Sequence, residues 1–385
     1  MRKGWDYKKL GEVGQIVTGS TPSTKDESNY SPREYCFVKP SDLPSQGIAD
    51  IEETEYYVSQ VGLSKSRVLP AGSVLVSCIG SIGKIGILTK EACSNQQINA
   101  IIPQDETDSR FIAYSLYAQR FVLESIANAP VVPIINKTDF SKITIGIPPK
   151  STQLSIVSEL DKINELIRLK REQLKDFDNL AQSIFYEMFG DPVENERGWD
   201  VKKIKDIATE KLSYGSGASA VPFNTSVRYI RITDINEYGE LKDEKVSPNI
   251  FDEKYLLAEG DILFARSGAT VGKTYLHKKN ENPCIYAGYL IRLRPNEMIV
   301  LPYYVYYYTK SNYYKSFICA NQRVVAQPNI NAKQYGNLDI PLPPLPLQQL
   351  FAQRIEQIEH QKAEVQKSIT DLETLLASRM QYWFE

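Results

Sequence analysis

The chain has 385 residues, with 45 Lys and Arg against 47 Asp and Glu, and a formal net charge of −2. This length allows two or three domains, and its 42% hydrophobic and 24% charged residues are ordinary for a globular protein. No apolar run approaches membrane-spanning length, and the opening MRKGWDYKKL has no apolar signal-peptide core. We therefore expect a cytoplasmic protein without membrane contact.

Net charge and cysteine spacing bear on three possible features: a polyanionic partner, disulfides and a zinc site. The net charge does not by itself indicate a polyanionic partner, although residues 198–345 carry 19 basic and 15 acidic side chains, net +4. The five cysteines form no CxxC pair, so we expect free thiols and neither disulfides nor zinc ligands. They are Cys36, Cys78, Cys93, Cys284 and Cys319.

Residues 1–147 are predicted to form a module that mixes short strands with a few helices. The module opens with GWDYKKLGEV at Gly4, and an alternating apolar strand over 35–38 is followed by Ser41 and Asp42. VLVSCIGSIGKIGIL then reads as a strand, a Gly-rich turn ending in Gly-Lys, and a second strand. A short aromatic helix from Phe111 and the strand ITIGIPP complete the module.

Residues 148–190 are predicted to form one long helix. Two prolines precede it, Ser151 can cap its first turn, and the sequence MFGDP ends it at Gly190. With one exception, Lys170, apolar residues recur at alternating steps of four and three from Ile156 to Met188, a span of roughly 50 Å. This spacing is typical of a helix packed along another helix of similar length.

Residues 191–342 repeat the first module. GWDVKKIKDI opens at Gly198, an alternating strand ends in Thr233 and Asp234, and ILFARSGATVGKTYL repeats the strand, Gly-Lys turn and strand. The aromatic run YYVYYYTKSNYY and the strand LDIPLPP follow in the same order. The segments match while the loops between them differ, which indicates two sites built alike that recognise different things.

Residues 343–385 are predicted to form a second long helix behind Pro343-Pro344. A shift of 195 positions, from Ile156 to Phe351, carries the first apolar seam onto the second and predicts a coiled-coil pair. The predicted seam comprises Ile156, Leu160, Ile163, Ile167, Leu174, Phe177, Ile355, Ile358, Val365, Ile369, Leu372 and Leu376. An outward charged face, either solvated or available to a partner, is predicted at Glu159, Arg168, Arg171, Lys175 and Asp178.

These motifs, in this order and twice over, resemble the specificity subunits of type I DNA restriction-modification enzymes over essentially the whole chain. The resemblance rests on the two module openings, the turns CIGSIGK and RSGATVGK, the PP-x-x-x-Q helix starts with Gln153 and Gln348, and the MFGDP helix end. The second module departs from the pattern where GSG, from Gly215, replaces the GSTP that begins at Gly19. This departure affects the expected shape of that loop.

The resemblance implies a mixed α/β (α+β) fold in which two tandem target-recognition domains alternate with two long helices paired as an antiparallel coiled coil. Each domain would read one half of a bipartite, asymmetric site on double-stranded DNA. The helices would set the gap and dock two methyltransferase subunits. Two restriction-translocase subunits, where present, would complete a type I site-specific deoxyribonuclease and adenine methyltransferase complex.

The resemblance also implies a non-catalytic chain that binds no cofactor or metal, with S-adenosylmethionine, ATP and Mg²⁺ used by its partner subunits. The residues agree with this expectation. GATVGKT, from Gly268, has three residues between its glycines where a phosphate-binding loop has four, and its counterpart GSIGK is shorter still. The repetition of this segment indicates a structural turn.

Candidate DNA contacts are the Arg, Lys, Ser and Gln side chains in polar stretches beside the matched strands. Arg pairs with guanine and Gln with adenine in the major groove, while Lys and Ser contact phosphates. The candidates are Lys39, Ser41, Arg67, Lys84, Gln96, Arg228, Arg231, Arg266, Lys273, Arg323 and Gln327. For each one, an exposed or internally paired side chain is the competing interpretation.

A protein of a different class would share the same helices. A coiled-coil adaptor that joins two protein-binding domains would need no nucleic acid, and retention on a DNA or heparin column distinguishes it from a DNA-recognition subunit. A self-contained methyltransferase is disfavoured, because the chain has neither a GxGxxG strand-helix unit nor an Asn/Asp-Pro-Pro-aromatic motif.

Overall fold

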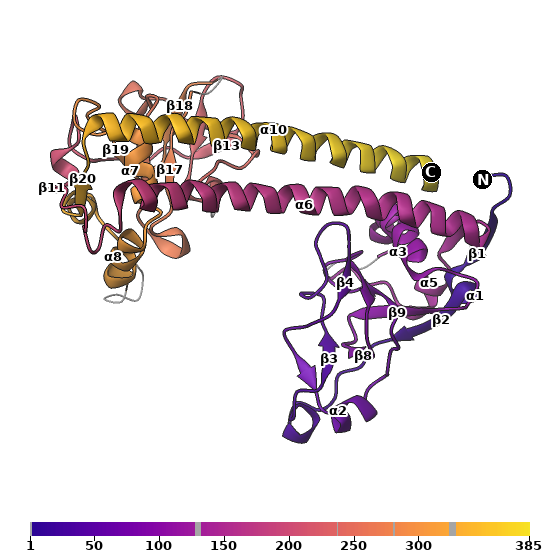
Figure 1. Ribbon diagram of the computed structural model, residues 1–385. Helices are drawn as coiled ribbons and strands as arrows, with labels where there is room; N and C mark the ends of the chain where they lie inside the picture. The colour runs from indigo at the N-terminus through magenta and orange to yellow at the C-terminus, as the bar shows by residue number, and fades with distance from the viewer. Residues whose placement is uncertain (1, 128–131, 237, 280–281, 323–328) are drawn as a thin grey trace. The chain divides into compact units, whose positions relative to one another are not determined.

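The computed structural model of the chain describes residues 2–127, 132–236, 238–279, 282–322 and 329–385. Contacts divide it into two compact units: a first unit, Met1–Lys170 with Ser368–Glu385, and a second unit, Arg171–Lys367. Each unit contains one globular module together with parts of both long helices (Figure 1). This division follows contacts and not sequence order, so it does not test the four predicted segments.

Module 1, the globular part of the first unit, has three sheets in its described residues. Their strand orders are β2-β9-β6-β7-β4, β5-β3-β8 and β1-β10. The strands are β1 (Asp6–Lys9), β2 (Gly14–Thr18), β3 (Tyr35–Val38), β4 (Ile48–Ile51), β5 (Tyr57–Val58), β6 (Val74–Ser77), β7 (Ile85–Leu88), β8 (Ala92–Ser94), β9 (Ile98–Pro103) and β10 (Thr144–Ile147). The helices are α1 (Leu10–Val13), η1 (Glu27–Asn29), α2 (Gln60–Ser64), α3 (Ser109–Ala118), α4 (Arg120–Ile126) and α5 (Lys137–Ser141).

Module 2, the globular part of the second unit, repeats this plan. Its strand orders are β12-β19-β16-β17, β14-β18, β13-β15 and β11-β20. The strands are β11 (Asp200–Lys203), β12 (Ser213–Tyr214), β13 (Ala220–Pro222), β14 (Arg228–Ile230), β15 (Val246–Pro248), β16 (Ile262–Ala265), β17 (Thr274–Leu276), β18 (Cys284–Tyr286), β19 (Leu290–Leu293) and β20 (Asp339–Leu342). The helices are η2 (Ile204–Asp206), η3 (Ile232–Asp234), η4 (Glu253–Tyr255), η5 (Gly268–Thr270), α7 (Pro302–Tyr308), α8 (Asn312–Gln322) and α9 (Ala332–Gly336).

The central strands of both modules separate two cores. In β6, Val74 and Val76 pack into the core that contains α3, whereas Leu75 packs into the core beside β3. The side chains of β16 divide in the same way, with Phe264 on the helix side and Leu263 on the other. Because side chains alternate along a strand, a largely apolar strand that is buried on both faces produces this three-layer arrangement.

The modules differ mainly at their edges. Module 1 adds β4 parallel to β7 at the end of its large sheet. Module 2 instead pairs β13 with β15. The parallel pairs β3-β8 and β14-β18 and the antiparallel pairs β1-β10 and β11-β20 are common to both. The predicted mixed fold of two tandem modules is thereby confirmed.

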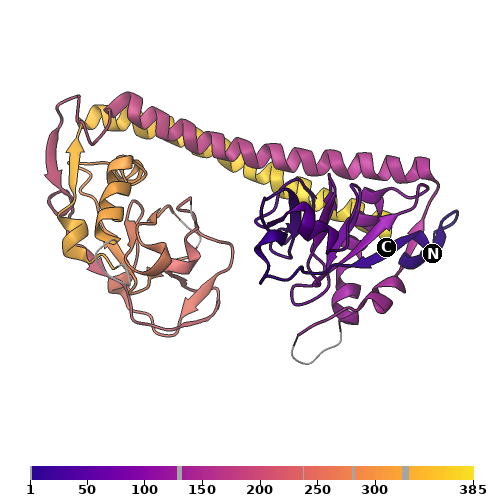
Figure 2. The same ribbon diagram turned by 90° about the horizontal axis from the view of Figure 1, so that it is seen from below.

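The two long helices are α6 (Lys150–Phe189) and α10 (Leu345–Phe384), of 40 residues each. They pack side by side with opposite directions in both units (Figures 1 and 2). In the first unit Glu159 of α6 binds Arg379 of α10. In the second unit Phe189 of α6 stacks edge-on against Phe351 of α10, with ring centroids 5.1 Å apart. Gly190, with φ +79°, follows the end of α6.

Burial along the helices follows the spacing of the apolar residues. Of the predicted seam residues, eight are buried: Ile156, Leu160, Ile163, Ile167, Ile355, Ile358, Val365 and Ile369. The other four, which are half-buried, are Leu174, Phe177, Leu372 and Leu376. Two members of the expected outward face lie elsewhere, because Glu159 bonds to Arg379 and Asp178 pairs with Lys362 of α10 at 2.7 Å. Those two carboxylates connect the helices while staying half-buried.

A buried glutamine connects each long helix to its module. Gln153 is 1% exposed, and its Oε1 accepts from the backbone N–H of Asp108, which caps α3 (2.9 Å). Gln348 is 0% exposed and accepts from the backbone N–H of Leu301, which precedes α7 (2.8 Å). Each amide also donates to the carbonyl oxygen of the first proline before its helix, 2.9 Å and 2.8 Å away. The PP-x-x-x-Q motif therefore positions the aromatic helix on the start of the long helix.

Within the part of the chain that the structure describes, no helix combines the length and the apolar character needed to cross a membrane.

Candidate nucleic-acid interface

The polar candidates of module 1 gather where several strands end. Strands β3 and β8 run parallel, so the residues after Val38 and after Ser94 leave the sheet at one edge. The loop after β2 joins them, because the Ser20 N–H donates to the carbonyl oxygen of Ser94 (2.8 Å). The residue after β6, Cys78, donates its N–H to Gln97 (2.8 Å). Four loops from distant parts of the sequence therefore meet at this edge, which we call edge 1.

Edge 1 holds three of the predicted DNA-contacting side chains. Lys39 places its Nζ 3.1 Å from the centre of the Tyr56 ring, a close cation–π contact. Lys84 Nζ donates to the carbonyl oxygen of Pro40 (3.2 Å). Gln96 is exposed, and its Oε1 accepts from the hydroxyl of Thr21 (2.7 Å). Two ammonium groups and an oriented amide thus lie together on one loop surface.

Module 2 builds the equivalent edge, edge 2. The Ala287 N–H donates to Ile230, and the Ser216 N–H donates to Tyr286, so the ends of β14, β18 and β12 are joined as in module 1. The Arg266 N–H donates to the carbonyl oxygen of Tyr289 (3.1 Å), which adds the end of β16.

Two arginines on edge 2 have different surroundings. The Arg231 guanidinium binds Asp234 through Nη2 (2.7 Å) and Nε (3.1 Å), and the Asp234 side chain is 6% exposed. This ion pair raises the pKa of Arg231 and uses its Nε and Nη2 donors, while no hydrogen bond to a described residue uses Nη1. Arg266 lies over the ring of Tyr214 (4.7 Å), and its Nε donates to Asn329 Oδ1 (3.2 Å).

Other candidates lie near these edges or away from them. Arg67 is exposed and donates to the carbonyl oxygen of Thr18, the last residue of β2 (2.6 Å). Ser41 is exposed two residues beyond Lys39, and Lys273 is half-buried in the turn after β16. Arg228 begins β14 and donates to the carbonyl oxygen of Lys242 (2.5 Å), so it does not join edge 2. The predicted Arg323 and Gln327 lie outside the described residues.

Aromatic residues on both edges were missed by sequence reasoning. Tyr56, Tyr214 and Tyr289 are 42%, 41% and 62% exposed. The rings of the first two make cation–π contacts with Lys39 and Arg266. Thr21, whose hydroxyl orients Gln96, is likewise not among the predicted contacts. Each of these partners is distant in sequence from the side chain that it contacts, so no local sequence pattern indicates the contact.

The Gly-Lys turns are tight connections between antiparallel strands, as the repetition predicted. Gly83 and Gly272 have φ of +79° and +87°, which glycine adopts at little cost. The first turn joins β6 to β7 and the second joins β16 to β17. A phosphate-binding loop would lead from a strand into a helix, so these turns do not form one.

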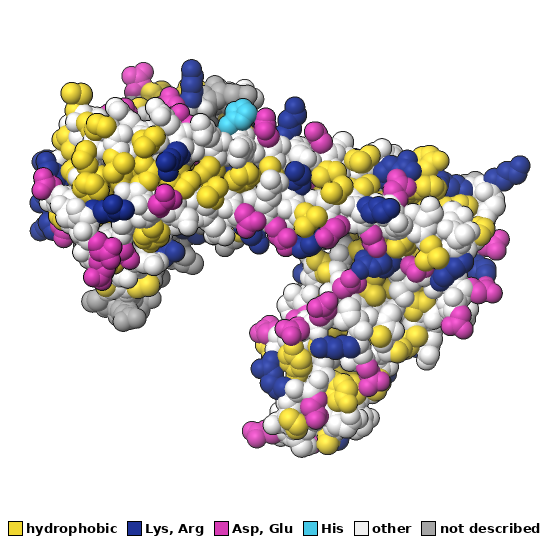
Figure 3. Space-filling model, in the orientation of Figure 1, with side chains coloured by type: hydrophobic (Ala, Val, Ile, Leu, Met, Phe, Trp, Pro, Cys, Tyr) yellow, Lys and Arg dark blue, Asp and Glu magenta, His cyan; other side chains and the backbone are white. Residues whose placement is uncertain are grey.

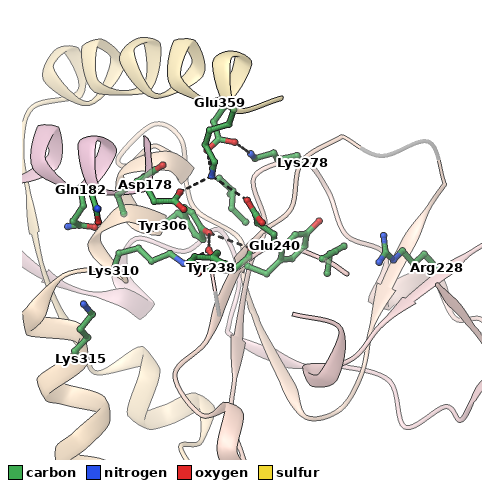
Figure 4. Close-up of a pocket in the computed structure, with 17 residues that line it drawn as sticks. Asp178, Gln182, Arg228, Tyr238, Glu240, Lys278, Tyr306, Lys310, Lys315 and Glu359 are labelled. Atoms are coloured by element: carbon green, nitrogen blue, oxygen red, sulfur yellow. Dashed lines mark hydrogen bonds and ion pairs between the residues drawn. The ribbon is translucent and has the colours of Figure 1, made fainter. Parts of the chain in front are cut away.

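A pocket of about 520 Å³ lies in the second unit beside α6, α10 and α7 (Figure 4). Lys362, 12% exposed, pairs with Asp178 at 2.7 Å and with Glu240 at 3.3 Å. Lys310 lies over the Tyr306 ring at 4.7 Å and donates to the carbonyl oxygen of Tyr238 at 2.8 Å. These contacts tie both long helices and α7 to the turn around Glu240, so the pocket residues have a structural role.

Basic and acidic side chains are interspersed over the face shown in Figure 3. In the described residues, no group of three or more His, Cys, Asp and Glu side chains could hold a metal ion. The candidate interface therefore rests on a few positioned side chains.

The fold and the two edges define a class of protein: a chain with two copies of one mixed α/β module, each carrying its own loop surface and followed by a long helix. The family model for the type I restriction modification DNA specificity domain matches residues 2–176 and again residues 196–374. The chain belongs to this family, which confirms the resemblance found in the sequence.

Similar proteins carry consistent names. The chain is 26% identical to the type I restriction enzyme MjaIX specificity subunit of Methanocaldococcus jannaschii, over 70% of this chain and 67% of that protein. It is 24% identical to the MjaVIII specificity subunit of the same organism, over 97% of this chain and 92% of that protein. The HindI specificity subunit of Haemophilus influenzae is 30% identical over 55% of this chain and 42% of that protein.

Solved structures share the fold. A chain from a structure of a type I R-M system, described for its complex assembly and conformational transition, matches with a TM-score of 0.58 and 18% identity, covering 100% of this chain and 98% of that chain. The S subunit of a type I restriction-modification system from M. genitalium matches with a TM-score of 0.52 and 15% identity, covering 98% and 95%.

Proposed function

We propose that this chain is the DNA-recognition subunit of a type I restriction-modification complex, in which module 1 and module 2 each bind one half of a bipartite, asymmetric DNA site. One observation carries the proposal: edge 1 and edge 2 are built on the same hydrogen-bonded strand ends but present different side chains. Two unlike readers on one scaffold suit a site with two unlike halves.

The long helices are proposed to set the gap between the half-sites and to dock two methyltransferase subunits. A helix of 40 residues is about 60 Å long, because each residue adds 1.5 Å. Contacts to phosphate groups by residues such as Lys39 and Lys84 would fix the position of each module on the duplex.

The chain is proposed to be non-catalytic and to bind no cofactor itself. Adenine methylation with S-adenosylmethionine would belong to the methyltransferase subunits. DNA cleavage with ATP and Mg²⁺ would belong to two restriction-translocase subunits where these are present. The proposed place of action is the cytoplasm, where the complex would meet its DNA.

The proposal is tested by the salt dependence of DNA binding. Lysine or arginine contacts to phosphate release counterions, so log K falls with log salt by about 0.9 for each phosphate neutralised. With Lys39, Lys84, Arg231 and Lys273 in contact with phosphate, a slope of about −3.6 is expected for the chain on mixed-sequence duplex DNA. Fluorescence anisotropy between 50 and 200 mM salt measures this slope.

Lys205→Ala provides a matched control, because Lys205 is an exposed cation on module 2 that bonds to Asn337 (3.2 Å) away from edge 2. It should leave the slope unchanged, whereas Lys84→Ala should reduce it by about one. A wild-type slope near zero would contradict DNA binding and favour the coiled-coil adaptor.

A further inference from the structure

We propose that the two modules read bases from different places on their shared framework. In module 2, Arg266, held by Tyr214 and Asn329, reads a guanine; in module 1, Gln96, held by Thr21, reads an adenine. The inference rests on the proposed function and deepens it, because it assigns the residues that determine specificity at each half-site.

Hydrogen bonds establish which residues of the two modules correspond. The Gly83 N–H donates to Ser77 and the Gly272 N–H donates to Ala265, both at 3.0 Å, so the residues that follow, Cys78 and Arg266, occupy the same place. The N–H groups of these two residues also have corresponding acceptors, the carbonyl oxygens of Gln97 and Tyr289. The carbonyl oxygens of Cys78 and Arg266 likewise accept from the N–H groups of residues 135 and 330, both at 2.9 Å.

The first place of divergence is therefore Arg266. Its counterpart Cys78 is 2% exposed and carries no charge that could reach DNA. Asn329 corresponds to Ile134, which is 44% exposed and apolar. Edge 2 thus has a polar cluster where module 1 has a buried thiol and an aliphatic side chain.

The Arg266 side chain is oriented with donors to spare. Its guanidinium lies on the Tyr214 ring, and the Tyr214 hydroxyl is itself fixed by the N–H of Ala332 (3.0 Å). The hydrogen bond to Asn329 uses only Nε. Hydrogen bonds between described residues leave both terminal nitrogens of Arg266 unused, and these are the groups that bind O6 and N7 of guanine in a bidentate contact.

The second place of divergence is Gln96. The Ser20 N–H donates to the carbonyl oxygen of Ser94, and the Ser216 N–H donates to that of Tyr286, both at 2.8 Å. The residues that follow, Thr21 and Gly217, therefore occupy the same position. By the same framework Gln96 corresponds to Gly288. Both partners of the Thr21–Gln96 pair are thus glycine in module 2, where no side chain can read a base.

The Gln96 amide keeps the groups that adenine requires. Its oxygen accepts one hydrogen bond from Thr21 and retains a second lone pair, and no described residue accepts a hydrogen bond from its Nε2. An amide with one acceptor and one donor available matches N6 and N7 of adenine. The hydroxyl of Thr21 is a positioning group and makes no base contact.

Positions that are basic in both modules have a different role. Lys39 corresponds to Arg231, since both donate their backbone N–H to an aspartate three residues on (2.7 Å and 2.9 Å). Lys84 corresponds to Lys273 at the end of the Gly-Lys turn. A cation at the same place in both modules suits a phosphate group, which both half-sites share, so we assign these four residues to phosphate contacts.

The test uses the full chain assembled with its methyltransferase subunits. The complex methylates a library of DNA with randomised positions, and single-molecule sequencing then gives the base preference at each position of both half-sites. Loss of one bidentate contact should reduce discrimination at that position by roughly 5- to 150-fold. Arg266→Ala should relax one guanine in one half-site only, and Gln96→Ala should relax one adenine in the other half-site only.

Controls separate a reading role from a structural one. Arg266→Lys keeps the charge but loses the paired geometry, so it should show an intermediate preference even if Arg266→Ala fails to fold. Lys205→Ala removes a cation elsewhere on module 2 and should leave both half-sites unchanged. Thr21→Val should relax the same adenine as Gln96→Ala, but less completely.

Two results would overturn the inference. If Arg266→Ala lowers methylation equally at all sequences, the arginine contacts phosphate; if neither variant changes any base preference, the readers lie elsewhere. A wild-type complex that methylates without a bipartite motif would instead contradict the proposed function, so the two failures are distinguishable.

Discussion

At the residue scale, the basic side chains on edges 1 and 2 fall into two groups. Some form an ion pair within the protein, and others keep N–H donors that could contact DNA. Arg231 and Arg266 both follow strands and are equally basic in sequence, yet Arg231 binds a buried aspartate and Arg266 lies on a tyrosine. The sequence could have indicated the first pairing, since Asp234 is only three residues away. It could not indicate the second, because Tyr214 and Asn329 are distant from Arg266 along the chain.

Arg231→Ala should therefore destabilise the protein, whereas Arg266→Ala should not. Removing Arg231 leaves the carboxylate of Asp234, 6% exposed, without its charged partner, which costs about 2 kcal/mol after allowance for the partial exposure of the arginine. Urea denaturation followed by circular dichroism measures both variants. Equal loss of stability in the two would show that the surroundings of these arginines do not differ as described.

Lys310 gives a second prediction at this scale, in pH dependence. Desolvation is the main cause that lowers the pKa of Lys310 to about 8. The positive charges of Lys362 and Lys315 also lower this pKa, and the negative charges of Asp178 and Glu240 raise it. Below pH 8 Lys310 is charged in both the folded and the unfolded chain, so folding bears the full free-energy cost of desolvating its ammonium group. Between pH 8 and its ordinary value of 10.5 only the unfolded chain keeps the proton, so stability rises with pH.

The measurement compares the wild type with Lys310→Met from pH 7 to pH 10. The free energy of unfolding of the wild type, relative to the variant, should rise as pH passes 8, because the variant has no proton to lose there. Parallel profiles over this range would show that Lys310 is not desolvated in the folded state.

At the scale of the elements, sequence pattern identified the long helices well. The predicted segments 148–190 and 343–385 contain α6 and α10, because proline pairs and Gly190 set their limits and the apolar spacing indicates a packed face. The pattern did not reveal that Glu159 and Asp178 connect the helices. A carboxylate beside an apolar seam looks solvated in sequence, and only the partner across the pair decides its role.

Gln348 tests how the helices hold the modules. Gln348→Leu leaves the part-buried N–H of Leu301 and the buried carbonyl oxygen of Pro343 without partners, which should cost roughly 2 kcal/mol. Gln361→Leu, an exposed site on the same helix, is the matched control and should change stability little. Thermal unfolding compares the two. Similar melting temperatures would mean that the buried amide does not secure α7 on the helix.

At the scale of the whole molecule, the internal repeat was the strongest signal in the sequence. Offsets of 194 and 195 positions revealed two modules and two helices, and the sheet orders repeat accordingly. The loops carry little such information, because residues from four separate segments meet only after folding. Sequence reasoning therefore indicated the edges as polar regions but could not pair Gln96 with Thr21 or Arg266 with Tyr214.

The central claim is that this one chain determines which DNA sequence is methylated. Single-molecule sequencing of genomic adenine methylation tests it directly, in a host that carries the chain and its methyltransferase subunits, compared with the same host lacking only the chain. The account predicts a bipartite motif with a fixed gap that disappears when the chain is removed. An unchanged methylation pattern, with the methyltransferase shown to be active, would contradict it.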